Sequence, residues 1–206
     1  NLTLVGENAA GKTTLANCFF PMLIDGSIAT PSFNAARDTE KVAQSTRVRN
    51  SQQDTRTFES MLLGWGPGAM KVRTGYSYLQ LRSPQRQVIL GIGAQRTQGV
   101  GGTTWWFVAI SEAKAPLTVI TTDAQGASLT EAAFVAANQA LGQQLSVFKK
   151  ADAYREFVAT HVYGFSSEKE LSQLANVYRL LASPILTGGN AKFSPIKAAL
   201  RDAQAS

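Results

Sequence analysis

The chain has 206 residues, 44% of them hydrophobic and 17% charged, which indicates one globular domain with a buried core and excludes a disordered chain. The formal net charge of +6 favours a polyanionic partner such as nucleic acid, although a merely basic domain accounts for it equally well. A single cysteine, Cys18, excludes a disulfide framework and a CxxC metal site, and a single histidine, His161, argues against a histidine-rich site.

No apolar run approaches the roughly 18 residues of a membrane span and no signal peptide is visible, so we expect a cytoplasmic protein without a membrane partner. The chain begins at Asn1, directly before an apolar pattern, and it ends inside a helix-like pattern over residues 194–205. From these two ends we expect residues 1–206 to be a piece of a longer polypeptide.

The first element pair surrounds a phosphate-binding motif. Residues 2–5 have the pattern of a short buried strand, and residues 12–24 the pattern of a helix that Pro21 kinks or ends. Between them the sequence GENAAGKT matches G-x-x-x-x-G-K-[ST], whose expected context is a strand before and a helix after. Glycines allow successive backbone N–H groups to point at phosphate oxygens, and the helix N-terminus adds a partial positive charge. We therefore predict a nucleotide phosphate site.

Individual residues of this loop have distinct predicted roles. Lys12 contacts the β- and γ-phosphates, the Thr13 hydroxyl ligates Mg²⁺, and Thr14 either contacts the α-phosphate or caps the helix. The predicted nucleotide-binding residues are Gly6, Glu7, Asn8, Ala9, Ala10, Gly11, Lys12, Thr13 and Thr14.

A polar segment over residues 25–56 follows the helix. Its Ser, Thr, Asn and Gln content predicts a long loop on the protein surface. Flexible cations on an exposed surface suit contact with DNA phosphates, but the acids interspersed among them leave a solvated loop as the alternative. The candidate DNA-contacting residues are Arg37, Lys41, Arg47, Arg49 and Arg56.

The middle of the chain has the pattern of β-strands and the last part the pattern of helices. The adjacent Trp105 and Trp106 point to opposite faces of their strand, which favours packing over stacking on bases. Thr130 or Ser128 is the predicted N-cap of the first of these helices. Strands are predicted over residues 71–82, 87–94, 103–110 and 117–122, with a hairpin loop at 83–86 and a glycine-rich connection at 98–102, and helices over residues 129–141, 152–161 and 168–181.

Hydrolysis by a phosphate-loop enzyme also needs an acidic residue for Mg²⁺ and a group that positions water. Two predicted strands are followed by acids, Glu112 and Asp123, but neither presents an Asp-Glu pair. Each is a candidate for the acid on the metal, although a residue of a strand-end turn is the better account of both. The sequence thus predicts a site that binds nucleotide phosphates but lacks the residues for a complete hydrolytic site.

The loop from Gly6 to Thr13 resembles the phosphate loop of ABC-type ATPases and, among them, of SMC proteins, whose G-x-N-x-x-G-K-[ST] form Asn8 matches. Residues 152–189, with the helix sequence VYRLL and a paired glycine, are similar to the segment before the first coiled-coil arm of MukB-like SMC heads. The resemblance implies an α/β fold of the P-loop NTPase type. It implies an ABC/SMC-type head lobe whose mixed β-sheet includes antiparallel strands and is flanked by helices.

The same resemblance explains the missing acids, since SMC heads are split and their C-terminal part carries the signature motif and the acidic strand. Residues 1–206 are then the N-terminal part of the head, with a coiled coil and the C-terminal part beyond. The implied cofactors are ATP and Mg²⁺, with ATP held between two engaged heads. The implied partners are the C-terminal part of the same head, a second head in a homodimer, kleisin and accessory subunits, and DNA. The implied location is cytoplasmic and nucleoid-associated.

SMC heads also use a glutamine that follows a strand and contacts Mg²⁺ or the attacking water. Gln95, predicted to follow the strand over 87–94, is one catalytic candidate, with a solvated strand end as the alternative. Alignment to the C-terminal block instead places the position near Thr160 and His161, so His161 is the second candidate, against a structural histidine. The sequence LTGGN at 186–190 resembles the family's signature motif, but no acidic strand follows it, and a glycine helix stop is preferred.

The function implied is that of an SMC-type ATPase, which couples ATP hydrolysis to DNA translocation in loop extrusion. Two roles share this machinery. One is chromosome organisation and segregation, and the other is plasmid defence of the Wadjet type. Nothing in the sequence distinguishes between them. One alternative is a self-contained P-loop NTPase or kinase unrelated to SMC proteins, which predicts a complete acidic site. The other is a nucleotide-gated binding module that never hydrolyses.

Overall fold

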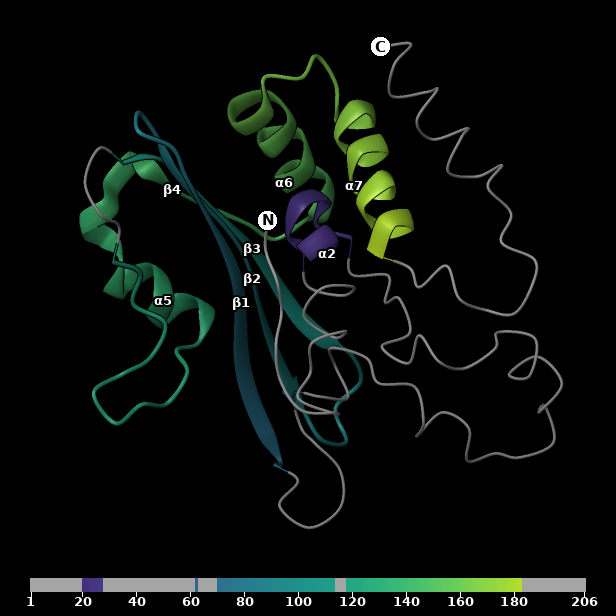
Figure 1. The fold of residues 1–206 in the computed structure, drawn as a ribbon. Helices are drawn as coiled ribbons and strands as arrows, with labels where there is room; N and C mark the ends of the chain where they lie inside the picture. Colours follow the sequence, from purple (N-terminus) through teal and green to yellow (C-terminus); the bar gives the residue numbers. More distant parts are fainter. Residues whose placement is uncertain (1–19, 28–61, 63–69, 114–117, 183–206) are drawn as a thin grey trace, which may run out of the picture.

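The structure is a computed structural model that describes residues 20–27, 62, 70–113 and 118–182. These residues form an α/β fold in which a four-stranded antiparallel sheet has helices on both faces (Figure 1). The strand order follows the chain, with β1 Val72–Arg82, β2 Gln87–Thr97, β3 Thr103–Ala113 and β4 Leu145–Phe148. The helices are α2 Phe20–Asp25, α5 Glu131–Ala137, the 3₁₀-helix η3 Gln139–Gln144, α6 Ala151–Phe157, the π-helix η4 Val158–Tyr163 and α7 Glu168–Ala182.

The first three predicted strands are confirmed as β1, β2 and β3. Ser83 and Arg86 close the predicted hairpin loop, with the Ser83 N–H donating to the Arg86 carbonyl at 2.8 Å. The glycine-rich connection from β2 to β3 is also confirmed, because Gly99 and Gly102 have φ values of 76° and 86° that favour glycine. The structure extends β2 to Thr97 and β3 to Ala113, beyond the predicted ends.

The fourth predicted strand, over residues 117–122, is wrong for the residues that the structure describes there. Residues 118–122 contribute a single isolated bridge, between Thr122 and Ser128. The fourth strand is instead β4, which lies between the helices predicted over 129–141 and 152–161, and it pairs with β3 from Phe107–Phe148 to Ile110–Leu145. All three strand pairings are antiparallel, so among the described residues the sheet is not the mixed one expected.

Asn138 explains why residues near Ile120 form no strand. The Asn138 side chain is 3% exposed, and its Oδ1 accepts the Ile120 N–H at 2.9 Å. Its Nδ2 donates to the carbonyls of Ile120 and Phe134, both at 2.8 Å. The backbone of Ile120 is therefore paired with a buried amide side chain, and a strand neighbour is not needed to satisfy it.

Asn138→Ala is expected to lower the free energy of unfolding by about 2 kcal/mol, because a buried amide loses three hydrogen bonds, two of them to the part-buried backbone of Ile120. Urea unfolding followed by circular dichroism measures the change. Gln139→Ala is the matched control, since it removes an exposed amide from the next residue. Equal destabilisation in the two variants contradicts the assigned role of Asn138.

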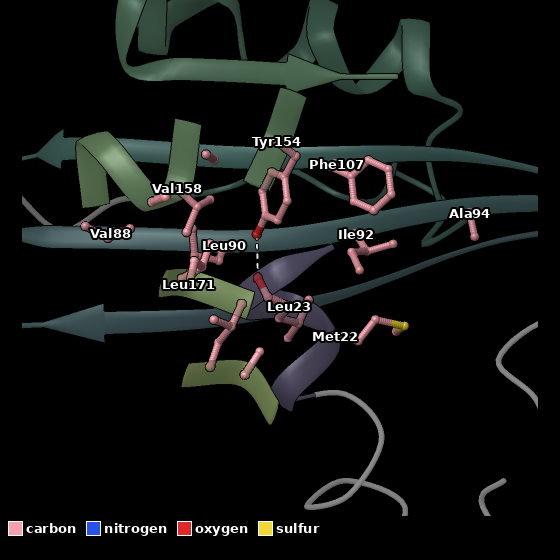
Figure 2. Close-up of a cluster of buried hydrophobic side chains, with 14 of the residues drawn as sticks. Met22, Leu23, Val88, Leu90, Ile92, Ala94, Phe107, Tyr154, Val158 and Leu171 are labelled. Carbon is pink, nitrogen blue, oxygen red and sulfur yellow. Dashed lines mark hydrogen bonds between the residues drawn. The ribbon is translucent and has the colours of Figure 1, made fainter. Parts of the chain in front are cut away.

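Side chains that alternate along the strands build two separate cores. Residues of β2 such as Leu90 and Ile92 face α2, α6 and α7, where they pack with Phe107 and Tyr154 (Figure 2). On the other face of the sheet, Ile89, Trp106 and Val108 pack with Phe134 of α5. Trp105 packs against the first core and Trp106 lies in the second, which confirms that the two indoles point to opposite faces.

The predicted helices are present, with changes at their ends. Thr130 is the N-cap of α5, and its Oγ1 accepts the Ala133 N–H at 3.5 Å. The helix predicted over 129–141 ends as an α-helix at Ala137 and continues as η3. The helix predicted over 152–161 is α6 continued by η4, and the one predicted over 168–181 is α7. In the described ranges no helix is long and apolar enough to cross a membrane.

Candidate functional site

α2 is the described end of the helix that the sequence places after the phosphate loop. Its residues Met22, Leu23 and Ile24 are at most 3% exposed and lie in the core between the sheet and α6 and α7. Pro21 lies within α2, so it does not end the helix. Gly26 closes the helix with a φ of 67°, and its N–H donates to the Met22 carbonyl at 2.9 Å. The helix therefore ends one residue past its predicted end, in a fully packed environment.

Two neighbouring residues of α6 bind the last carbonyls of α2. The Tyr154 hydroxyl donates to the Leu23 carbonyl, as the dashed line in Figure 2 shows, and the Arg155 Nε donates to the Asp25 carbonyl at 3.0 Å. Burial raises the pKa of the Tyr154 phenol well above its usual value, so the hydroxyl stays protonated and able to donate. The orphan carbonyls at the C-terminus of α2 thus have partners from a distant part of the chain.

Arg155 also connects α2 to α7. Its Nη1 lies 3.2 Å from Asp152 Oδ1 and 3.5 Å from Glu168 Oε2, the first residue of α7. The Arg155 side chain is 20% exposed, whereas that of Asp152 is 84% exposed, so the ion pairs orient the guanidinium more than they stabilise the fold. This arrangement fixes the end of α2 against two helices at once.

The predicted loop itself, Gly6 to Thr14, lies outside the described residues, and so does the Mg²⁺ ligand Thr13. The same holds for the LTGGN sequence at 186–190 and for the candidate DNA-contacting residues Arg37, Lys41, Arg47, Arg49 and Arg56. Their predicted roles stay predictions.

Gln95 was predicted at the end of its strand, but it lies inside β2. The strand continues to Thr97 because its last residues pair with β1. It lies opposite Thr74 of β1, and its Nε2 donates to Thr74 Oγ1 at 3.1 Å. Since Ala94 packs in the core that contains α2, the alternation of the strand places Gln95 on the opposite face, with α5. Gln95 therefore faces away from α2.

His161 lies in the exposed turn of the π-helix η4. Its ring stacks on Phe157, with centroids 4.4 Å apart and planes at 11°, and its Nδ1 is 2.7 Å from Thr160 Oγ1. The main-chain carbonyls of His161 and Val162 accept hydrogen bonds from Arg86 in the β1–β2 hairpin. His161 thus lies beside the hairpin end of the sheet.

The structure does not bring Gln95 and His161 together. Arg86, which contacts His161, directly precedes β2, and the eight residue steps from Gln87 to Gln95 span roughly 26 Å of strand. Because Gln95 also lies on the other face of the sheet, at most one of the two residues serves a given nucleotide.

Of the two candidate acids, Asp123 has a local structural role, and the side chain of Glu112 is outside the described part of the structure. Asp123 Oδ1 accepts the N–H groups of Gln125 and Ala127 at 3.0 and 2.8 Å, which makes it the turn residue that the sequence favoured. Glu112 lies inside β3, and its side chain is outside the description. Within the described ranges no group of three His, Cys, Asp or Glu side chains is arranged to hold a metal ion.

Sequence reasoning missed Tyr154 and Arg155 as the residues that hold α2. The aromatic and the arginine were visible next to each other, but their partners are carbonyls about 130 residues earlier, which no sequence pattern marks. Comparison with models of known protein families found no match, and comparisons with curated proteins and with solved structures found none either.

Proposed function

We propose that this chain is the ATP-binding half of an SMC-type ATPase head with a P-loop NTPase fold. The observation that carries the proposal is the spacing of Gly6, Gly11, Lys12 and Thr13 directly ahead of a predicted helix, whose described end is α2 in the core. A phosphate loop keeps its N–H groups aimed at phosphates when the helix after it is held still. Tyr154 and Arg155 provide such support at the far end of that helix.

In this proposal residues Gly6 to Thr14 bind ATP, with Lys12 on the β- and γ-phosphates and Thr13 on Mg²⁺. The signature motif and the catalytic acids belong to the C-terminal part of the head and to a second head, between which ATP is enclosed. Hydrolysis drives DNA translocation in loop extrusion, together with kleisin and accessory subunits, for chromosome organisation or for plasmid defence. Gln95 and His161 stay the two candidates for the residue beside the attacking water.

Lys12→Ala is expected to weaken binding of ATP with Mg²⁺ by at least about 100-fold, because the ammonium group is the main cation on the β- and γ-phosphates. Isothermal titration calorimetry on the chain measures the affinity. Lys169→Ala is the matched control, since it removes an exposed lysine from α7 and leaves the loop intact. Equal ATP affinity in the parent and in Lys12→Ala contradicts the proposal.

The half-site part of the proposal has its own test. The chain alone is expected to bind ATP with negligible turnover, because the acidic strand and the second head are absent. Phosphate release over time, measured with saturating ATP and Mg²⁺, gives the rate. Turnover at a rate typical of complete ATPases, about 1 per second or faster, refutes the half-site and favours a self-contained enzyme.

A further inference from the structure

The outer edge of β1 has no strand beside it in the described part of the chain. β1 is the first strand in the order β1-β2-β3-β4, so β2 is its one neighbour there (Figure 1). It is 11 residues long, and its pairing with β2 runs from Val72 opposite Thr97 to Arg82 opposite Gln87 without a register shift. No residue of β1 is buried. The backbone N–H and C=O groups that point away from β2 are therefore accessible to a further strand.

The middle of this edge lacks the features by which proteins protect a free strand edge from pairing. Those features are a short strand, a bulge, a proline or a charged side chain. The strand at the opposite edge of the sheet, β4, is protected in this way, because it is only 4 residues long. The stretch from Thr74 to Leu81, TGYSYLQL, has no charge and no proline, and its register is unbroken. An edge of this length and composition is suited to accept a partner strand.

Cations flank the uncharged middle of β1 at both ends. Lys71 and Arg73 lie at its start and Arg82 at its end, and all three are exposed. Residues 60–111 contain no acidic residue, so the neighbouring strand β2 supplies no carboxylate. Among the described residues none of the three side chains has an ion-pair partner. A strand that pairs along this edge therefore meets positive charge at both of its ends.

The same cations disfavour a second copy of this chain as the partner. Two β1 strands related by a twofold axis would pair antiparallel, so the start of each would lie beside the end of the other. Lys71 and Arg73 of one copy would then approach Arg82 of the other, and like charges opposite each other destabilise a strand pair. Acidic residues at both ends of the partner strand turn the same contacts into attractions.

The alternation of side chains along β1 determines what else the partner strand needs. Leu79 and Leu81 are half-buried and pack against the core that contains α2. Tyr78 and Gln80 point to the other face of the sheet, where Tyr78 is 58% exposed. A strand beside β1 alternates in the same way, so its apolar side chains on the face of Leu79 and Leu81 extend the core, and its polar side chains face solvent on the other.

We propose that the outer edge of β1 binds an extended peptide strand whose side chains alternate between apolar and polar and which carries acidic residues at both ends. The backbone of this strand pairs with β1 and adds a fifth strand to the four-stranded sheet. Main-chain hydrogen bonds supply affinity, and Lys71, Arg73 and Arg82 select the acidic ends. This peptide site is independent of the proposed nucleotide site, because β1 alone provides it.

The probe is a peptide of 11 residues, the length of β1, in which Val and Thr alternate between a Glu-Asp pair at each end. Fluorescence anisotropy of the labelled peptide with the full chain measures the affinity. Arg73→Glu with Arg82→Glu is expected to weaken binding by about 10-fold or more at low salt, because each change replaces an attraction by a repulsion. The same variant is expected to bind a peptide with Lys in place of the four acids more tightly than the parent does, which also shows that the variant is folded.

Lys150→Glu with Lys169→Glu is the matched control. It reverses two exposed cations outside β1, each at the start of a helix, where an acid is tolerated. We expect it to change the affinity for the acidic peptide by less than about 3-fold, as a distant change of net charge does. Equal losses in the two double variants, or no gain for the Lys peptide in Arg73→Glu with Arg82→Glu, overturn the proposal.

Amide hydrogen exchange followed by NMR tests the backbone pairing. Alternate N–H groups of β1 point to β2 and to the outer edge, and the peptide is expected to slow exchange of the outer set by about 10-fold or more. Amides of β3 that already pair on both sides, with β2 and β4, are expected to keep their rates. Peptide binding that protects no further amide of β1 overturns the proposal, because attraction between charges alone then explains it.

Two other partners are tested on the same samples. Sedimentation equilibrium without peptide is expected to show a monomer, and a dimer in which the outer amides of β1 are protected makes a second copy the partner and overturns the proposal. A DNA duplex of mixed sequence is expected to bind more weakly than the peptide. Tighter binding of the duplex, lost in Arg73→Glu with Arg82→Glu, overturns the choice of a peptide. Titration with ATP and Mg²⁺ tests the proposed function separately, since the peptide site is expected in the chain whether or not ATP binds.

Discussion

Gly93→Ala is expected to destabilise the fold by about 3 kcal/mol, the upper part of the range for overpacked cores. Gly93 lies directly opposite Trp106, and an added Cβ would be 2.1 Å from both Nε1 and Cε2 of the indole. The indole has no room to withdraw, because it is 1% exposed and meets Tyr76 edge-on at 5.6 Å. Urea unfolding measures the loss as a lower midpoint.

Gly91→Ala is the matched control, because Gly91 lies on the same strand and on the same face, two residues away. There an added Cβ would be 3.4 Å from the nearest atoms, the Ser77 carbonyl oxygen and Tyr78 Cβ. We expect a change of less than about 1 kcal/mol, since a slight shift relieves a contact of this length. Similar midpoints for the two variants contradict the tight packing of Trp106 over Gly93.

Tyr154→Ala is expected to lower the free energy of unfolding by about 4 kcal/mol and to weaken ATP binding as well. Tyr154 is fully buried, stacks on Phe107 at 5.4 Å, and binds the Leu23 carbonyl of α2. Its removal leaves a large cavity beside α2, the described end of the helix that is predicted to follow the phosphate loop. Tyr154→Phe is expected to cost about 1 kcal/mol, because only the hydrogen bond is lost.

Phe134→Ala separates loss of stability from loss of α2 support. Phe134 is an equally buried aromatic residue, but it stacks on Tyr76 in the core on the other face of the sheet. Both alanine variants are expected to lower the unfolding midpoint, whereas only Tyr154→Ala is expected to reduce ATP affinity, at a temperature where both are folded. Equal affinities for ATP in the two variants contradict a link between α2 and the nucleotide.

The sequence by itself determined most elements whose pattern is local. The strands β1, β2 and β3 and the hairpin loop at 83–86 were predicted correctly, and Thr130, one of the two predicted N-cap residues, is the cap of α5. These features depend on residues a few positions apart, so a short window contains their physical cause. The phosphate motif is local in the same sense, which is why it can be recognised without a fold.

Tertiary structure alone decided the features that depend on distant partners. Leu145–Phe148 is a strand because β3 offers it a free edge, and the residues around Ile120 are not a strand because Asn138 satisfies that backbone. The register of β1 on β2 set Arg73 against Arg96, and the length of β2 separated Gln95 from His161. Backbone pairing and side-chain burial join residues far apart in the chain, so no window of sequence contains the partner that decides them.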